Sequence, residues 1–165
     1  MKMKISSQTL FVISSVFIFL VSSLIWYLIL YQAIGFFIGL IILSFFIFLA
    51  FWQNLLAFRR AGELIGLKSK KQIFIISIIF VLGFSELVWS ISFMPFSFFI
   101  LGGILAVIFG VTLDIYTEYF KKLVNNNSPD FSGKIKKVII RDITAGVILI
   151  TIFIFISPWL PPKAY

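Results

Sequence analysis

The sequence predicts an all-α protein, a polytopic integral membrane helix bundle with five transmembrane helices. No charged side chain occurs between Ile5 and Phe58, and a bilayer core takes only about 20 apolar residues per helical crossing. Hydrophobic residues make up 61% of the chain and charged residues 12%, against roughly 25% charged in soluble domains. A chain of 165 residues cannot bury so much apolar surface in water, so we expect one transmembrane domain over residues 1–165.

Helices are expected over about 10–30, 36–58, 72–92, 98–119 and 143–160, with cytoplasmic loops at 59–71 and 120–142. The first helix follows Lys2 and Lys4. Its apolar run is longer than the 7–15 residues of a signal peptide and precedes no small-residue cleavage site, so we expect it to be retained. Gln32 and Gly35 predict a tight turn before the second helix, which is expected to end at Arg59.

The third helix is predicted to start with a capping box. Ser69 and Gln72 have the Ser-x-x-Gln spacing in which two side chains satisfy free backbone amides at a helix start. Pro95 predicts the turn into the fourth helix, because proline cannot continue a helical hydrogen-bond ladder. A polar stretch over 121–142 predicts a loop, and Pro158 favours an end to the fifth helix near residue 160.

Basic residues predict the orientation. With the amino terminus in the cytoplasm and the carboxyl terminus outside, all but Lys163 of the 14 basic residues fall on the cytoplasmic side. This distribution agrees with the positive-inside rule at each short loop. We therefore expect a multi-pass protein of the plasma membrane of a prokaryotic cell.

The absence of cysteine and histidine excludes much chemistry. No disulfide, thiolate nucleophile, zinc site of nitrogen and sulfur ligands, histidine-ligated haem or Ser–His dyad can form. We expect no cofactor. The net charge of +8 is explained by membrane orientation, so no nucleic acid partner is expected.

Glu86 is the one charged residue set well inside a predicted span. It lies roughly 20 Å from Gln72 along the helix, about two-thirds of the way across the core. Ser22 and Ser23 are expected at the same depth. Glu86 could relay protons or cations, contact a basic group of a partner subunit, or bond as a protonated acid to a serine across a helix interface.

Small residues predict close helix packing at two places. Gly35 and Gly39 form a Gly-x-x-x-Gly motif in the second helix. Within the fourth helix a residue of small or acidic type recurs at every fourth position: Gly102, Ala106, Gly110, Asp114 and Glu118. Steps of four drift by about 40° each, so only neighbouring members share a face.

Asp114, Glu118 and Asp142 are candidate ligands of a divalent cation near the cytoplasmic boundary. Mg²⁺ commonly uses one or two carboxylates together with substrate oxygens, so such a site could handle a lipid phosphate. The simpler interpretation, which we favour, pairs Glu118 with Lys122 and Asp142 with the adjoining Arg141, all at the wet interface, where Asp142 also favours the start of the fifth helix.

Basic and apolar residues interleave just before the fifth helix. Contact with anionic lipid headgroups is the expected role of four of them: Lys134, Lys136, Lys137 and Arg141.

Three functions remain open from the sequence. The favoured one is a non-enzymatic accessory or scaffold subunit of a membrane complex, with a membrane-protein partner or a second copy of the chain. The others are an inner-leaflet lipid-phosphate enzyme using Asp114, Glu118 and Asp142, and a proton- or cation-coupled transporter using Glu86. The chain has no paired broken helices, which counts against the transporter.

Overall fold

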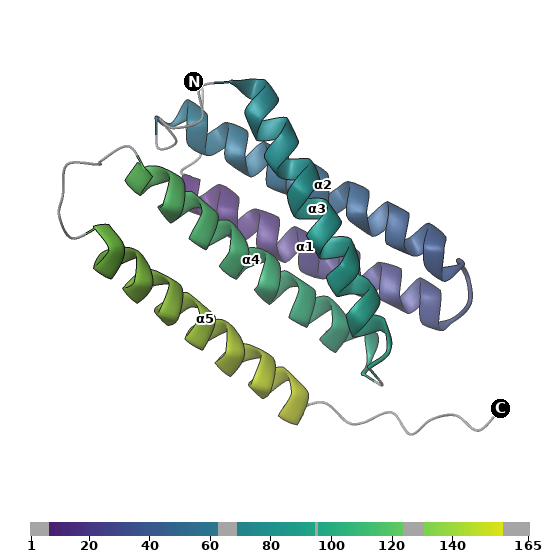
Figure 1. Cartoon of the computed structure of the whole chain (residues 1–165). Coiled ribbons are helices and arrows are strands. Elements are labelled where there is room, and N and C mark those ends of the chain that lie inside the picture. The colour runs from purple at the N-terminus through teal and green to yellow at the C-terminus, as the bar shows by residue number, and fades with distance from the viewer. Residues whose placement is uncertain (1–6, 63–68, 95, 124–130, 157–165) are drawn as a thin grey trace.

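The computed structural model describes residues 7–62, 69–94, 96–123 and 131–156, and every regular element in these ranges is a helix. Figure 1 shows long helices that run roughly along one direction. They are α1 (Ser7–Leu30), α2 (Phe36–Arg60), α3 (Lys70–Ser92), α4 (Phe98–Leu123) and α5 (Phe131–Ile156). The prediction of an all-helical bundle is confirmed.

Four helices are long and apolar enough to cross a membrane: Thr9–Leu30, Phe36–Arg60, Lys70–Ser92 and Phe98–Tyr119. Over the residues that the structure describes, α5 is not one of them. The prediction of five spans therefore holds for α1 to α4 only.

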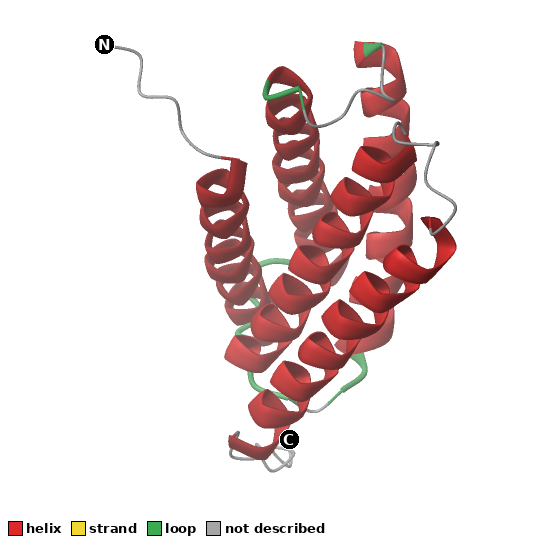
Figure 2. Cartoon of the chain, turned by 90° about the vertical axis from the view of Figure 1, so that its left-hand side faces the viewer, coloured by secondary structure: helices red, strands yellow, loops and turns green. Residues whose placement is uncertain are grey.

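The order of the helices in space differs from their order in the chain. α2 lies beside both α1 and α3, and α4 lies between α1 and α5, while α3 also reaches α4. α1 and α4 form the most extensive contact although two helices separate them in sequence. α5 lies at the edge of the bundle with α4 as its neighbour, as Figures 1 and 2 show.

The seam between α1 and α4 is built on small residues. A methyl group added to Gly102 would lie 2.8 Å from the backbone nitrogen of Ser23 and would also meet the Ser23 hydroxyl. Ser22 Oγ donates to the carbonyl of Ile18 at 2.6 Å and lies 3.3 Å from the carbonyl of Gly102. Such residues let two membrane helices approach until their backbones touch, and the packing prediction for Gly102 fits this contact.

Aromatic rings fill the space between α2, α3 and α4. We call this group the aromatic cluster; its members are Phe51, Phe80, Phe84, Phe109 and Tyr116. Phe51 and Phe80 stack with ring centroids 3.8 Å apart and an interplanar angle of 7°. α3 is thus attached to α4 through side chains that reach across the gap and has little backbone contact with it.

Of the two glycines in the predicted Gly-x-x-x-Gly motif, only Gly39 is closely packed. A methyl group on Gly39 would lie 2.5 Å from Ile29 Cδ1, so Gly39 packs against α1. Gly35 has no atom within 4 Å of that position and is the N-cap residue of α2.

The helix ends agree with the sequence at α3 and disagree at α5. Both hydrogen bonds of the capping box between Ser69 and Gln72 are present, which confirms it and starts α3 at Lys70. α5, predicted to start at 143, starts at Phe131, and α4 continues to Leu123. The loop predicted at 120–142 was therefore too long, because charged residues can continue a helix out of the apolar layer into water. Residues 124–130 and 157–160 lie outside the described ranges.

Candidate functional site

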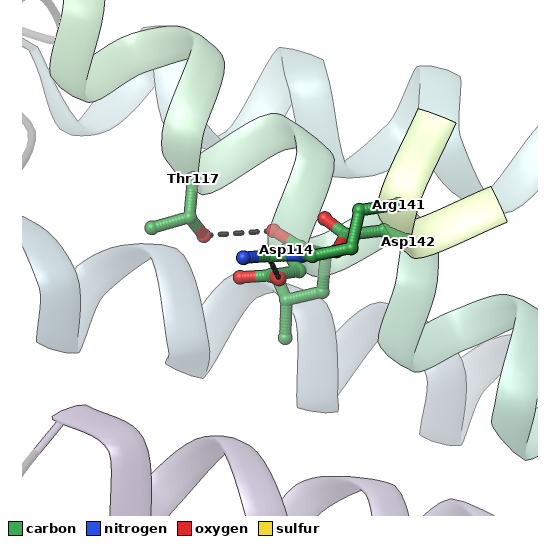
Figure 3. A network of polar contacts seen from close by, with 5 residues as sticks. Asp114, Thr117, Arg141 and Asp142 are labelled. Atoms are coloured by element: carbon green, nitrogen blue, oxygen red, sulfur yellow. Dashed lines mark hydrogen bonds and ion pairs between the residues drawn. The ribbon is translucent and has the colours of Figure 1, made fainter. Parts of the chain in front are cut away.

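An ion-pair network joins α4 to α5. Arg141 Nε donates to Asp142 Oδ1 at 2.7 Å, and Arg141 Nη2 lies 3.8 Å from Asp114 Oδ2. Figure 3 shows the guanidinium between the two carboxylates, with Thr117 one turn away. The pairing predicted between Arg141 and Asp142 is therefore present, and it includes Asp114. The prediction that Asp142 lies at the start of this helix is wrong, because α5 starts at Phe131.

The three members of this network are exposed to very different extents. Asp142 is 8% exposed, whereas 43% of the Asp114 side chain and 67% of the Arg141 side chain are exposed. The hydrogen bond that Arg141 donates to Asp142 and the negative charge of Asp142 raise the pKa of Arg141 above its usual value, so Arg141 stays cationic. The second oxygen of Asp142, Oδ2, has no hydrogen-bond partner within the described ranges.

A groove opens beside this network. It lies over α4, between α1 and α5, and its cavity volume is about 450 Å³. Nearly all of its lining is apolar, apart from Ser15 near one wall and the two aspartates at one end. The groove is lined by Phe11, Ser15, Val16, Phe19, Gly103, Ala106, Val107, Gly110, Val111, Asp114, Asp142, Ala145, Gly146, Leu149 and Phe153.

The small residues of α4 form the floor of this groove. Gly102 is covered by α1, but the drift of about 40° per step of four brings Ala106, Gly110 and Asp114 to the cavity. A methyl group on Gly110 would meet Ser15 Oγ at 3.5 Å, an ordinary contact distance. α5 approaches α4 through glycines as well, since Gly146 faces a methyl of Val111.

The proposed metal ligands are only partly brought together. Asp114 and Asp142 share Arg141, and Glu118 takes part in an interaction one turn further along α4. Within the described ranges no group of three or more acidic, histidine or cysteine side chains is arranged to hold a metal ion. The metal site stays a prediction, and the closest cation to the two aspartates is Arg141.

Glu86 lies on the exposed face of α3. Ser22 and Ser23 are buried between α1 and α4, so the structure does not bring these serines to Glu86. Ser90 Oγ donates to the backbone carbonyl of Glu86 at 2.9 Å. Among the described residues no side chain forms a hydrogen bond or ion pair with the Glu86 carboxylate, and Gly83 beside it is open to the surroundings.

The basic residues near α5 lie along its first turns. Lys136, Lys137 and Arg141 are exposed. Lys134 belongs to α5, but its side chain lies outside the described part. Their contact with anionic lipid stays a prediction.

Two polar contacts between spans were not predicted. Ser44 and Ser85 share a hydrogen bond of 2.9 Å between α2 and α3, and Asn54 Nδ2 donates to Ser14 Oγ at 2.7 Å between α2 and α1. The contact between Ser44 and Ser85 could have been predicted from the sequence, because Ser44 lies about as far from the end of α2 as Ser85 lies from the start of α3.

Comparison with known proteins adds no assignment. No family model matches the chain, and no match was found among curated proteins or solved structures. The function has to be argued from where the acidic residues lie in a bundle of membrane-span-like helices.

Proposed function

We propose that this protein is a non-enzymatic accessory or scaffold subunit of a membrane complex, which it joins through the outer face of α3. The observation that carries the proposal is the exposed carboxylate of Glu86 in a helix long and apolar enough to cross a membrane. A subunit whose surface holds an acid without a partner among the described residues is suited to bind another membrane protein.

The depth of Glu86 makes its exposure costly. Six residues separate it from the end of α3 at Ser92, a distance of about 9 Å along the helix. It therefore lies inside a hydrocarbon core of about 30 Å. An ionised acid near the middle of a span costs about 2.5–3.5 kcal/mol on insertion scales. A partner that supplies a charge or a hydrogen bond removes most of this cost.

The chemistry of Glu86 favours a basic partner residue. None of the described basic residues of this chain lies in the apolar part of a span: Arg59 and Arg60 end α2, and Lys70 and Lys71 begin α3. Within the described ranges, a second copy of the chain thus offers no cation at this depth. We infer that the partner is a different membrane helix carrying Lys or Arg.

The surface around Glu86 suits a packed helix. Gly83 and Ser90 lie on the same exposed face, where their small size allows close approach. Ile79 and Leu82 flank them with exposed fractions of 60% and 62%. The face combines one acid, two small residues and apolar side chains, which is the usual make-up of an interface between spans.

The orientation belongs to the same proposal. An amino terminus in the cytoplasm keeps Lys70 and Lys71 inside, as the positive-inside rule requires, and puts Glu86 in the outer half of a plasma membrane, which we take to be prokaryotic. We further propose that the apolar half of α5, which packs along α4, lies in the bilayer with it.

Anionic lipid is the second expected contact of the protein. The exposed side chains of Lys136, Lys137 and Arg141 support this proposal, and each basic residue near an anionic surface contributes about 1 kcal/mol. We include Lys134 in this proposed lipid contact because of its position in the sequence.

A lipid-phosphate enzyme is the second candidate, favoured by the meeting of Asp114 and Asp142 at one end of a groove. We rank it lower because Arg141 already neutralises one of the two carboxylates. Glu86 lines neither this groove nor the smaller cavity between α1 and α2, so the coupled transporter has less support.

Photocrosslinking in the native membrane tests the docking face. A photoreactive phenylalanine analogue replaces Leu82 on α3 and, as the matched control, Leu20 on α1. Both side chains are about 60% exposed, and each lies ten residues before the outer end of its helix. We expect one heterologous crosslinked product at Leu82 and none at Leu20. A product with twice the mass of the chain would mean that the partner is a second copy of this chain and not a different protein. Equal labelling at both sites would contradict the proposal.

A further inference from the structure

We propose that the groove between α1, α4 and α5 binds one phospholipid with a primary-amine headgroup, its acyl chain along the groove and its ammonium at Asp142. No residue of α3 lines this groove, so the site is independent of the proposed function.

The dimensions of the groove fit one leaflet. From Asp142 to Phe153 along α5 the lining covers about 16 Å, roughly half of a hydrocarbon core of about 30 Å. Phe153 closes one end by packing on Gly103, where an added methyl would lie 3.3 Å from its ring. The acidic residues lie at the opposite end, near the end of the α4 span at Tyr119. An apolar furrow with polar groups at one end has the polarity of a lipid.

The buried oxygen of Asp142 determines the headgroup. Oδ2 is buried without a hydrogen-bond partner in the described part of the chain, and nearly all such groups in folded proteins have one. It can only accept, so the missing partner is a donor. A primary ammonium supplies N–H donors and a positive charge, and charge-assisted hydrogen bonds of this kind are the strong ones.

The charges around the groove match both parts of such a headgroup. Among the described side chains, two carboxylates, Asp114 and Asp142, lie beside one guanidinium, Arg141, so an ammonium has the complementary charge. Arg141 is 67% exposed and has N–H groups left to bind the phosphate. A phosphatidylglycerol headgroup offers hydroxyl donors but no positive charge, and a phosphatidylcholine headgroup has the charge but no N–H.

Native mass spectrometry of the full-length protein tests this assignment. The delipidated protein in mild detergent is titrated with dioleoyl phosphatidylethanolamine, phosphatidylcholine or phosphatidylglycerol, and the fraction with one bound lipid is measured. We expect phosphatidylethanolamine to bind at least about tenfold more tightly than either other lipid, since the choline headgroup cannot donate and the glycerol headgroup has no cation.

Three variants locate the site. Asp142→Asn keeps the shape of the side chain and should remove the preference for phosphatidylethanolamine. Ala106→Phe fills the floor of the groove and should reduce binding of all three lipids. Glu86→Gln, which also changes an acid to an amide but on α3, should leave binding unchanged. Thermal unfolding in detergent shows whether each variant is folded.

Two results would overturn the proposal. Equal retention of the three lipids would mean that the Asp142 oxygen is satisfied in another way, for example by a proton shared with Asp114. A preference for phosphatidylethanolamine that survives both Asp142→Asn and Ala106→Phe would place the lipid elsewhere on the protein.

Discussion

The α1–α4 seam and the outer face of α3 both contain small and polar residues, which are covered in the seam and open on α3. In the seam, Gly102 is covered by the backbone of Ser23, and Ser22 contacts the Gly102 carbonyl. On α3, Gly83 has open space where a side chain would be, and the Glu86 carboxylate has no partner among the described residues. The seam is thus a closed interface, whereas the α3 face is open and is the surface that we propose a partner covers.

The aromatic cluster holds α3 against α2 and α4. Disrupting it has the largest expected effect on stability. Phe51→Ala removes the ring stacked on Phe80 and leaves a cavity between α2 and α3. We expect a loss of about 2–3 kcal/mol in the free energy of unfolding. The same substitution in the core of a water-soluble protein costs ~3–5 kcal/mol. The expected loss is smaller in a membrane protein because the ring stays in an apolar medium, the lipid, when the helices separate. Denaturation in mixed micelles measures it, and a loss below ~0.5 kcal/mol would contradict the role given to the cluster.

Glycine substitution compares the two faces directly. Gly102→Ala forces α1 and α4 apart and should cost about 1–3 kcal/mol. Gly83→Ala on the open face should change the stability of the isolated protein by less than ~0.5 kcal/mol. The same mixed-micelle titration checks both. Equal losses would mean that the two faces are not different in packing.

The fold was largely predictable and the site only in part, for physical reasons. The lengths of the apolar stretches and the capping box predicted α1 to α4, since a helix that crosses the membrane must be as long as the bilayer core is thick. The predicted start of α5 at 143 is wrong because the polar stretch over 121–142 was expected to be a loop, whereas Lys136, Lys137 and Arg141 lie on α5 and basic side chains are stable on a helix in water.

For the site, spacing predicted that Asp142 pairs with Arg141. It did not predict that the same guanidinium reaches Asp114, because that depends on which helices are neighbours. Sequence position likewise gave the depth of Glu86 but not the face of α3 on which it lies.

Serine substitution gives the smallest expected effect. Ser22→Ala removes a hydroxyl that lies 3.3 Å from a carbonyl of the neighbouring helix, and hydrogen bonds between membrane helices average about 0.6 kcal/mol. Ser90→Ala removes only a bond within α3 and should have no measurable effect on the isolated protein. A larger effect for Ser90→Ala than for Ser22→Ala in the same titration would reverse the comparison.

The central claim is that Glu86 is the contact to a partner span, and affinity purification of the full-length protein from its native membrane in mild detergent tests it most directly. The partner retained by the unmodified protein should be retained equally by Asp142→Asn and at least about tenfold less by Glu86→Gln, because a charge-assisted hydrogen bond is lost. If Glu86→Gln and Glu86→Ala both retain the partner as well as the unmodified chain does, the α3 face is not the interface.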